Sequence, residues 1–159
     1  VVLAQLEVPL HTIEMAFTQA RSNGAVTVLN PAPAREIPES LLSLANIVVP
    51  NETESAAIGG TKNLLKLGAA TVITTLGADG ASIETSSSTT HITPHKVTPV
   101  DTVGAGDAFI GATCAELSRG ASIEDAARMG AIAGALATTV KGAVPSLPTR
   151  QAVLAAQKS

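Results

Sequence analysis

A loop of small residues runs directly into a predicted helix between Val100 and Phe109, with the sequence Val-Asp-Thr-Val-Gly-Ala-Gly-Asp-Ala-Phe. The first amides of a helix have no partner within it, so we expect the N–H groups of Gly104, Ala105 and Gly106 to point outward. The two glycines let a ligand approach the backbone closely, and the helix dipole adds partial positive charge. The segment therefore predicts an anion pocket.

Two carboxylates flank this pocket, Asp101 at the entrance of the loop and Asp107 in the first helical turn. Aspartate is also a common structural residue at a helix start, and Asp101 can equally be a turn residue that bonds Val103. Two acids beside an anion site make it a poor phosphate binder unless they handle protons or cations. From the residues alone, the two aspartates can be either structural residues of the loop and helix start or groups that handle protons or cations.

Residues 101–107 resemble the signature of the ribokinase (PfkB-type) sugar kinase family. Residues 51–54, Asn-Glu-Thr-Glu, are similar to the second motif of that family, and residues 75–80, Thr-Leu-Gly-Ala-Asp-Gly, to its nucleotide-binding loop. Three further segments add to the likeness, and they are residues 5–7, 29–35 and 141–146. The motifs follow the family order along essentially the whole chain. The resemblance covers the C-terminal part of such an enzyme, without its N-terminal sugar-binding motif and lid.

The resemblance makes Asp107 the catalytic base, which accepts the proton of the ribose 5-hydroxyl as that oxygen attacks the γ-phosphoryl group of ATP. A carboxylate at a helix N-terminus is ionised at neutral pH. A weak base suffices, because positioning and charge stabilisation carry most of the catalysis in phosphoryl transfer. By the same resemblance, the amides of Gly104, Ala105 and Gly106 hold the charge that develops on the phosphoryl oxygens.

The resemblance assigns the nucleotide to Asn51, Gly106, Asp107 and a loop. The loop residues are Thr75, Leu76, Gly77, Ala78, Asp79 and Gly80. Glu54 would organise Mg²⁺ through water, because this ion sheds its hydration shell reluctantly. The spacing of Asn51 and Glu54 equally fits an Asn cap with a capping-box glutamate, and the loop equally fits an ordinary tight turn. The segment 51–75 is shorter than is usual in the family, so we expect a clipped helix there.

The resemblance also implies a monovalent cation, typically K⁺, that tunes the field of the anion pocket. Its ligands would be the carboxylate of Asp101, four backbone carbonyls and a contact from a serine. The carbonyls are those of Val103, Ala137, Val140 and Gly142, and the serine is Ser146.

Alternating strand and helix patterns must position these residues. Short apolar runs at 1–6, 25–29, 46–49 and 71–75 predict parallel strands covered on both faces. The predicted helices are 10–21 (with Ile13, Ala16, Phe17 and Ala20 on its apolar face), 61–67, 105–117, 122–138 and 149–156. Segments 81–84 and 91–97 predict an antiparallel pair with a turn at 86–88. This order implies an α/β fold, and the resemblance makes it the ribokinase-like three-layer α/β/α class with a mostly parallel central sheet.

Polar residues follow the predicted strands. They are Glu7, Asn30, residues 51–54 and residues 75–77. Ligands of such sheets bind beyond the carboxyl ends of the strands, where we expect these residues to gather. By resemblance Glu7 accepts a hydrogen bond from a ribose hydroxyl, whereas alone it is simply an exposed glutamate.

Other reactive side chains have structural interpretations. Cys114 lies inside an Ala-rich helix and is expected in the core. The three histidines, His11, His91 and His95, lack the grouping of metal ligands. Glu124 and Asp125 follow Ser122 as a first-turn acid pair, which is typical of a helix start.

Composition excludes several classes of function. Of the 159 residues 45% are hydrophobic and 14% charged, so a core can form. The net charge of −3 and the near absence of aromatic residues argue against nucleic-acid and membrane-surface partners. A single cysteine suits a reducing cytoplasm, and no apolar run is long enough to span a bilayer. The apolar opening at residues 1–6 suggests a chain cut from a longer one.

We therefore expect residues 1–159 to be the C-terminal portion of a single ribokinase-like kinase domain. The implied reaction is ATP-dependent phosphorylation of D-ribose to D-ribose 5-phosphate, with ATP, Mg²⁺ and K⁺ in the cytoplasm. The partners are then a small sugar and a nucleotide, and the resemblance allows a homodimer of the complete enzyme. Three alternatives remain, which are a kinase for another sugar or a nucleoside, a non-catalytic nucleotide-binding remnant, and a structural fragment without a ligand.

Overall fold

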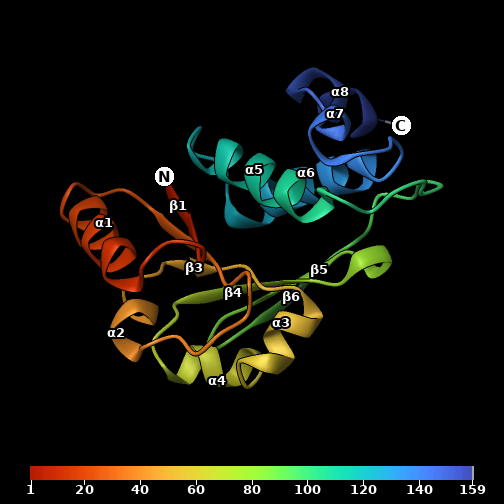
Figure 1. Ribbon diagram of the computed structural model, residues 1–159. Helices are drawn as coiled ribbons and strands as arrows, with labels where there is room; N and C mark the ends of the chain where they lie inside the picture. Colours follow the sequence, from red (N-terminus) through yellow and green to blue (C-terminus); the bar gives the residue numbers. More distant parts are fainter. Residues whose placement is uncertain (159) are drawn as a thin grey trace. The chain divides into compact units, whose positions relative to one another are not determined.

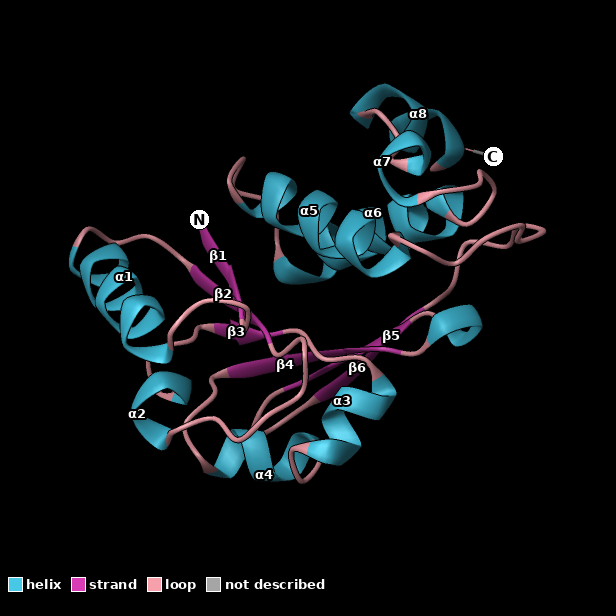
Figure 2. Cartoon of the chain, viewed as in Figure 1, coloured by secondary structure: helices cyan, strands magenta, loops and turns pink. Residues whose placement is uncertain are grey.

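The structure, a computed structural model, describes residues 1–158 and divides into two compact units. The first unit comprises residues 1–75 and 82–90, and the second comprises residues 76–81 and 91 onward. The prediction of a single domain is not tested by this division. Figure 1 shows the course of the chain, and Figure 2 its helices and strands. No helix within residues 1–158 has the length and apolar character needed to cross a bilayer.

Six strands form one sheet in the order β1-β2-β3-β4-β5-β6. They are β1 (Val2–Gln5), β2 (Thr27–Asn30), β3 (Ile47–Val48), β4 (Thr71–Thr75), β5 (Ala81–Glu84) and β6 (Thr89–Ile92). The first four strands pair in parallel, with Leu29 beside Val48 and Val48 beside Val72. Buried aliphatic residues occupy both faces of β2, β3 and β4, as the apolar runs predict.

One apolar cluster joins the helices of the first unit to one face of the sheet. The helices are α1 (Leu10–Ser22), α2 (Glu39–Leu42), α3 (Glu52–Ala57) and α4 (Thr61–Lys66). Phe17 of α1, Leu41 of α2 and Leu64 of α4 are all buried in the cluster with Leu29, Val48 and Val72. Ala16 was expected on the apolar face of α1 but is exposed, because the buried stripe is narrower and consists of Ile13, Phe17 and Ala20. The helix predicted at 61–67 is α4, and α3 precedes it; each has six residues.

The edge of the sheet differs from the prediction in one strand. The turn at 86–88 is confirmed, since the Thr85 N–H donates to the Ser88 carbonyl at 2.9 Å. The strand after it is β6 (Thr89–Ile92) rather than residues 91–97. Because the turn is short, β6 begins at Thr89, two residues earlier than expected. Pro94, which lacks an N–H, follows soon after the strand ends.

Four helices make up most of the second unit. They are α5 (Ala105–Leu117), α6 (Ile123–Ala137), α7 (Ala143–Ser146) and α8 (Arg150–Ala156). Gly130 and Gly134 lie one turn apart on α6 and face α5. A Cβ at Gly134 would lie 3.1 Å from the Ala105 carbonyl oxygen, and one at Gly130 would collide with the Thr113 hydroxyl. The absence of side chains there lets the backbones of α5 and α6 approach closely.

Candidate functional site

The loop 101–104 turns into α5 through a glycine in the left-handed region. Gly104 has φ of 82° and precedes the first helical residue. A Cβ there would also lie 3.2 Å from the Ala143 Cα, so the turn that begins α7 packs directly on this loop. Asp107 is the third residue of α5 and is exposed. The predicted loop-to-helix junction is therefore present.

The amides of this junction are only partly available to a ligand. The Ala105 N–H donates to the Thr102 carbonyl at 3.2 Å, so the expectation that it is unpaired is wrong. A tight turn over Thr102 provides this partner, which the sequence pattern did not reveal. The amides of Gly104 and Gly106 make no hydrogen bond with any of residues 1–158. A Cβ at Gly106 would meet no atom within 4 Å, so its backbone borders open space.

The carboxylate of Asp101 ties this loop to a distant turn. Its Oδ1 accepts from the Val103 N–H at 3.0 Å, which is the turn bond of the structural interpretation, and its Oδ2 accepts from the Gly142 N–H at 2.8 Å. These bonds, that from Gly142 foremost, lower the pKa of the Asp101 carboxyl from its ordinary value. Asp101 is therefore an anion that joins residues 101–104 to the start of α7.

The residues expected to hold a monovalent cation lie in the second unit around the same turn. Backbone amides of Val100 and Asp101 both donate to the Thr138 carbonyl, which ends α6, at 2.7 and 3.0 Å. Ser146 is buried, and its hydroxyl donates to the Ala143 carbonyl at 2.7 Å. The carbonyl oxygens of Val140 and Gly142 accept no hydrogen bond from residues 1–158. Oxygen atoms of this kind fit a hard cation.

Residues 76–80 of the predicted nucleotide loop form a short 3₁₀ turn in the second unit, whereas Thr75 belongs to the first unit. Residues Gly77–Asp79 form the turn, and the Leu76 N–H closes it on the Gly80 carbonyl at 2.8 Å. Gly80 has φ of 87°, and a side chain there would collide with the Ile92 carbonyl. Gly77, Ala78 and Asp79 are exposed. The loop therefore presents a fixed and accessible backbone.

In the first unit, Asn51, Glu54 and Thr75 come together. Asn51 Oδ1 accepts from the Glu54 N–H at 2.7 Å, and Glu54 Oε2 accepts from the Asn51 N–H at 2.9 Å, which completes a capping box. Asn51 also pairs with Thr75 in a parallel bridge, and the Thr75 N–H donates to the Pro50 carbonyl at 3.0 Å. Residues 51–54 therefore form the Asn cap and capping box of the structural interpretation. It leaves Asn51 Nδ2 and Glu54 Oε1 without a partner among residues 1–158.

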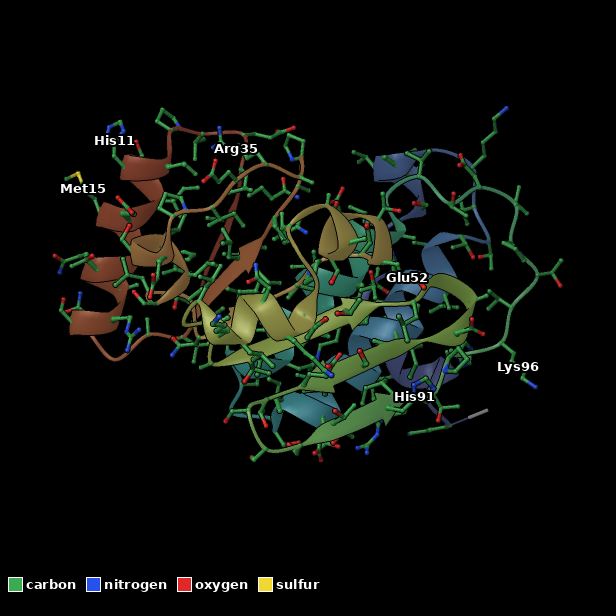
Figure 3. All side chains as sticks on the ribbon, turned by 90° about the horizontal axis from the view of Figure 1, so that it is seen from below. His11, Met15, Arg35, Glu52, His91 and Lys96 are labelled. Atoms are coloured by element: carbon green, nitrogen blue, oxygen red, sulfur yellow. The ribbon has the colours of Figure 1, made fainter. Side chains whose placement is uncertain are left out.

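Glu7 lies at the carboxyl end of β1 and is exposed. The segment around it is held by the loop after β2, because the Leu6 N–H donates to the Ala32 carbonyl at 2.9 Å and Arg35 Nη2 to the Val8 carbonyl at 3.1 Å. Arg35 is labelled in Figure 3. The sequence placed Asn30 at this edge without giving it a role. Its side chain is buried and bonded on both sides.

A cleft of about 310 Å³ in the second unit was not predicted. Its lining includes Asp107, small residues of α5 and, at the other end of that helix, Glu116 and Arg119. Arg150 donates to both carboxylate oxygens of Glu116, at 2.7 and 3.2 Å, and lowers the pKa of that carboxyl. This contact joins α8 to α5 and fills part of the wall. The spacing of residues within α5 or within α8 does not predict this ion pair.

The residues given structural roles behave mainly as expected. Ser122 caps α6, and its Oγ accepts from the Asp125 N–H at 3.1 Å. Cys114 is half-buried rather than fully in the core, and burial raises the pKa of its thiol. Figure 3 shows His11 and Met15 together on α1, and both are exposed. Within residues 1–158, no three His, Cys, Asp or Glu side chains come together as a metal site would require.

Residues 2–150 match the family described as pfkB family carbohydrate kinase. The chain belongs to this family. It is 41% identical over 165 residues to the ribokinase of Staphylococcus aureus (strain COL), in an alignment that covers 96% of this chain and 54% of that relative. The predicted resemblance is thereby confirmed. The chain spans about half the length of the curated relatives it matches.

Solved structures give the same result. The structure of Arabidopsis thaliana ribokinase complexed with ribose and ATP has a TM-score of 0.92 and 29% identity, over 99% of this chain and 55% of that one. Aminoimidazole riboside kinase from Salmonella enterica, complexed with aminoimidazole riboside and an ATP analog, has a TM-score of 0.84 and 28% identity, over 92% of this chain and 57% of that one. These likenesses confirm the fold class predicted from the sequence.

Proposed function

We propose that the chain forms the C-terminal portion of a single ribokinase-like kinase domain, and that the complete protein phosphorylates the 5-hydroxyl of D-ribose with ATP. The observation that carries this proposal is the 41% identity to a ribokinase along almost the whole chain. The geometry of the Gly104–Asp107 junction supports it, because an exposed carboxylate stands beside two uncommitted backbone amides.

In this mechanism Asp107 accepts the proton of the attacking hydroxyl. The amides of Gly104 and Gly106 stabilise charge on the transferred phosphoryl group, and Ala105 contributes only if its bond to Thr102 opens. Asn51 and the loop 75–80 bind the nucleotide, and Glu7 binds a ribose hydroxyl. We place the protein in the cytoplasm, where ATP is available as the phosphoryl donor. We propose that the complete protein is either a monomer or a homodimer.

We also propose Mg²⁺ and K⁺ as the ions of this reaction. Mg²⁺ supplies charge neutralisation of the phosphates. Glu54 Oε1 is the oxygen that the capping box leaves for a water of that ion. K⁺ would be held by carbonyl oxygens of Val103, Ala137, Val140 and Gly142, with Asp101 and Ser146 beside it. The three carbonyls that accept no hydrogen bond from residues 1–158, those of Val103, Val140 and Gly142, are the best suited of these.

A kinase for another sugar or for a nucleoside is the second candidate, favoured by the likeness to the riboside kinase. A coupled assay of ADP release by the complete protein separates the candidates, with D-ribose, deoxyribose and a riboside as acceptors. Ribose should give the highest kcat/KM. ADP release that no acceptor stimulates, together with calorimetric binding of ADP, would identify a nucleotide-binding remnant instead. Absence of both would leave a structural fragment.

A further inference from the structure

Asn30 is a buried amide at the carboxyl end of β2, and it bonds to the strands on either side. Its side chain is 5% exposed. Oδ1 accepts from Gln5 Nε2 at 2.9 Å, and Nδ2 donates to the Val49 carbonyl at 2.8 Å. Gln5 ends β1, and Val49 directly follows β3. The three strands are adjacent in the sheet, with β2 between the others (Figure 2).

The two partners of Asn30 lie beside two different parts of the proposed site. Gln5 is two residues before Glu7, the proposed sugar ligand, and Val49 is two residues before Asn51, the proposed nucleotide ligand. Backbone bonds extend both connections, from Leu6 to Ala32 and from Thr75 to Pro50. One side chain therefore links the segment that leads to Glu7 with the segment that leads to Asn51.

Only an amide satisfies both partners. Asn30 offers one acceptor to a donor and one donor to an acceptor. An aspartate at this position would place a carboxylate oxygen against the Val49 carbonyl, and an aliphatic residue would leave both partners unsatisfied where water is excluded.

We propose that Asn30 is a positioning residue of the kinase, which holds Glu7 and Asn51 at the separation that phosphoryl transfer requires. This inference rests on the proposed function for the identity of the ligands, but not for the coupling of the two segments. A displacement of about 1 Å in such a site can cost about a hundredfold in rate.

Asn46 provides a matched control at the opposite ends of the same strands. Its Oδ1 accepts from the N–H and the hydroxyl of Thr27, each at 2.9 Å, immediately before β3. It is thus another amide that links neighbouring strands, but far along the strands from Glu7 and Asn51. Asn46→Leu, which removes the acceptor of both bonds, should destabilise the fold without changing the spacing at the carboxyl ends.

Amide hydrogen exchange in the 159-residue chain tests the coupling without any ligand. In Asn30→Asp, exchange at Leu6 and Thr75 should quicken at least about tenfold more than the slowest-exchanging amides, whose rates report global stability. In Asn46→Leu, which leaves the Thr27 N–H without its acceptor, the excess should appear at Thr27 instead. Unchanged relative protection of Leu6 and Thr75 in Asn30→Asp, or equal effects of both variants on them, would overturn the proposal.

If Asn30→Asp does not fold, Gln5→Met carries the test, because it removes the donor to Asn30 Oδ1 without burying a charge. It should quicken exchange at Leu6 and spare Thr75, and no change at Leu6 overturns the proposal. In the complete protein, Asn30→Asp should lower kcat/KM about tenfold to a hundredfold for both sugar and ATP, while Asn46→Leu leaves both KM values unchanged. Wild-type protein that phosphorylates no sugar would refute the proposed function, and the exchange result would still decide the role of Asn30.

Discussion

Residues 51–54 and 101–107 both place acidic side chains at the start of a helix, yet they are held in different ways. In 51–54 the two partners lie three residues apart and close on each other's backbone at 2.7 and 2.9 Å. In 101–107 the carboxylate of Asp101 reaches Gly142, which is 41 residues further along the chain. The first arrangement is local, whereas the second exists only after the helices of the second unit have packed.

The difference shows that a structural role and a ligand role can use different atoms of one side chain. The capping box uses Asn51 Oδ1 and Glu54 Oε2 and leaves the other polar atom of each side chain uncommitted. Asp101 commits both carboxylate oxygens to backbone amides, so a cation there would share oxygen atoms that already accept hydrogen bonds. Four substitutions separate these roles.

The largest effect should come from Asp107→Asn in the complete protein. If Asp107 is the general base, kcat should fall by about 10²–10⁴-fold, as measured by steady-state kinetics with ribose. Asp125→Asn is the matched control, because Asp125 is likewise the third residue of its helix, α6, and its exposed carboxylate contacts Arg128 and the Ser122 hydroxyl. The control should stay within about twofold of wild type. A kcat for Asp107→Asn within about tenfold of wild type would exclude the base role.

Glu54→Gln should have the next largest effect. Glutamine keeps an oxygen that can accept from the Asn51 N–H, so the capping box and the melting temperature should be nearly unchanged. Loss of the charge should raise the Mg²⁺ concentration for half-maximal activity by about 10–100-fold, as is usual for residues that hold a metal through water. A magnesium titration measures this value. An unaltered titration would leave Glu54 with a capping role alone.

Asn51→Ala removes the side-chain acceptor of the Glu54 N–H. The loss of an N-cap should lower the free energy of unfolding by about 1 kcal/mol, as measured by urea denaturation of the 159-residue chain. Ser122→Ala gives a comparison at α6, whose cap also accepts from the third residue. If Asn51→Ala changes the affinity for ADP no more than Ser122→Ala does, its role as a nucleotide ligand fails.

The smallest effect should be the change with pH in the contribution of Asp101 to the stability of the fold. Its pKa is lowered in the folded chain by bonds from Gly142 and Val103, so its contribution to stability is complete above the unfolded pKa of about 3.9. That contribution is lost as the pH falls through the lower folded pKa. The difference in melting temperature between wild type and Asp101→Asn should therefore be constant from pH 7 to 5 and shrink below about pH 4. A difference that persists unchanged into stronger acid would contradict the bonded carboxylate.

Local signals in the sequence predicted much of this molecule. The helix expected at 105–117 is α5 (Ala105–Leu117), because glycines and small residues mark its start. The strand expected at 71–75 is β4 (Thr71–Thr75). The four-residue helix α2 was missed, since it is too short for a periodic pattern.

Contacts between distant segments were not predictable in the same way. Asp101 was recognised, but its bond to Gly142 depends on how α6 ends and α7 begins. Asn30 was placed at the correct edge, yet only the register of β1 against β2 brings it beside Gln5. The pairing of Ala105 with Thr102 arises from a turn geometry that the residue types allow but do not require. The assigned ligand roles of these residues remain predictions.

The glycine-lined approach of α6 to α5 has a mechanical consequence. With no side chains at Gly130 and Gly134, the backbone of α6 lies close against the first turns of α5, the helix whose third residue is Asp107. A bulkier residue at position 134 would press on the Ala105 carbonyl and misdirect the acid without touching any ligand.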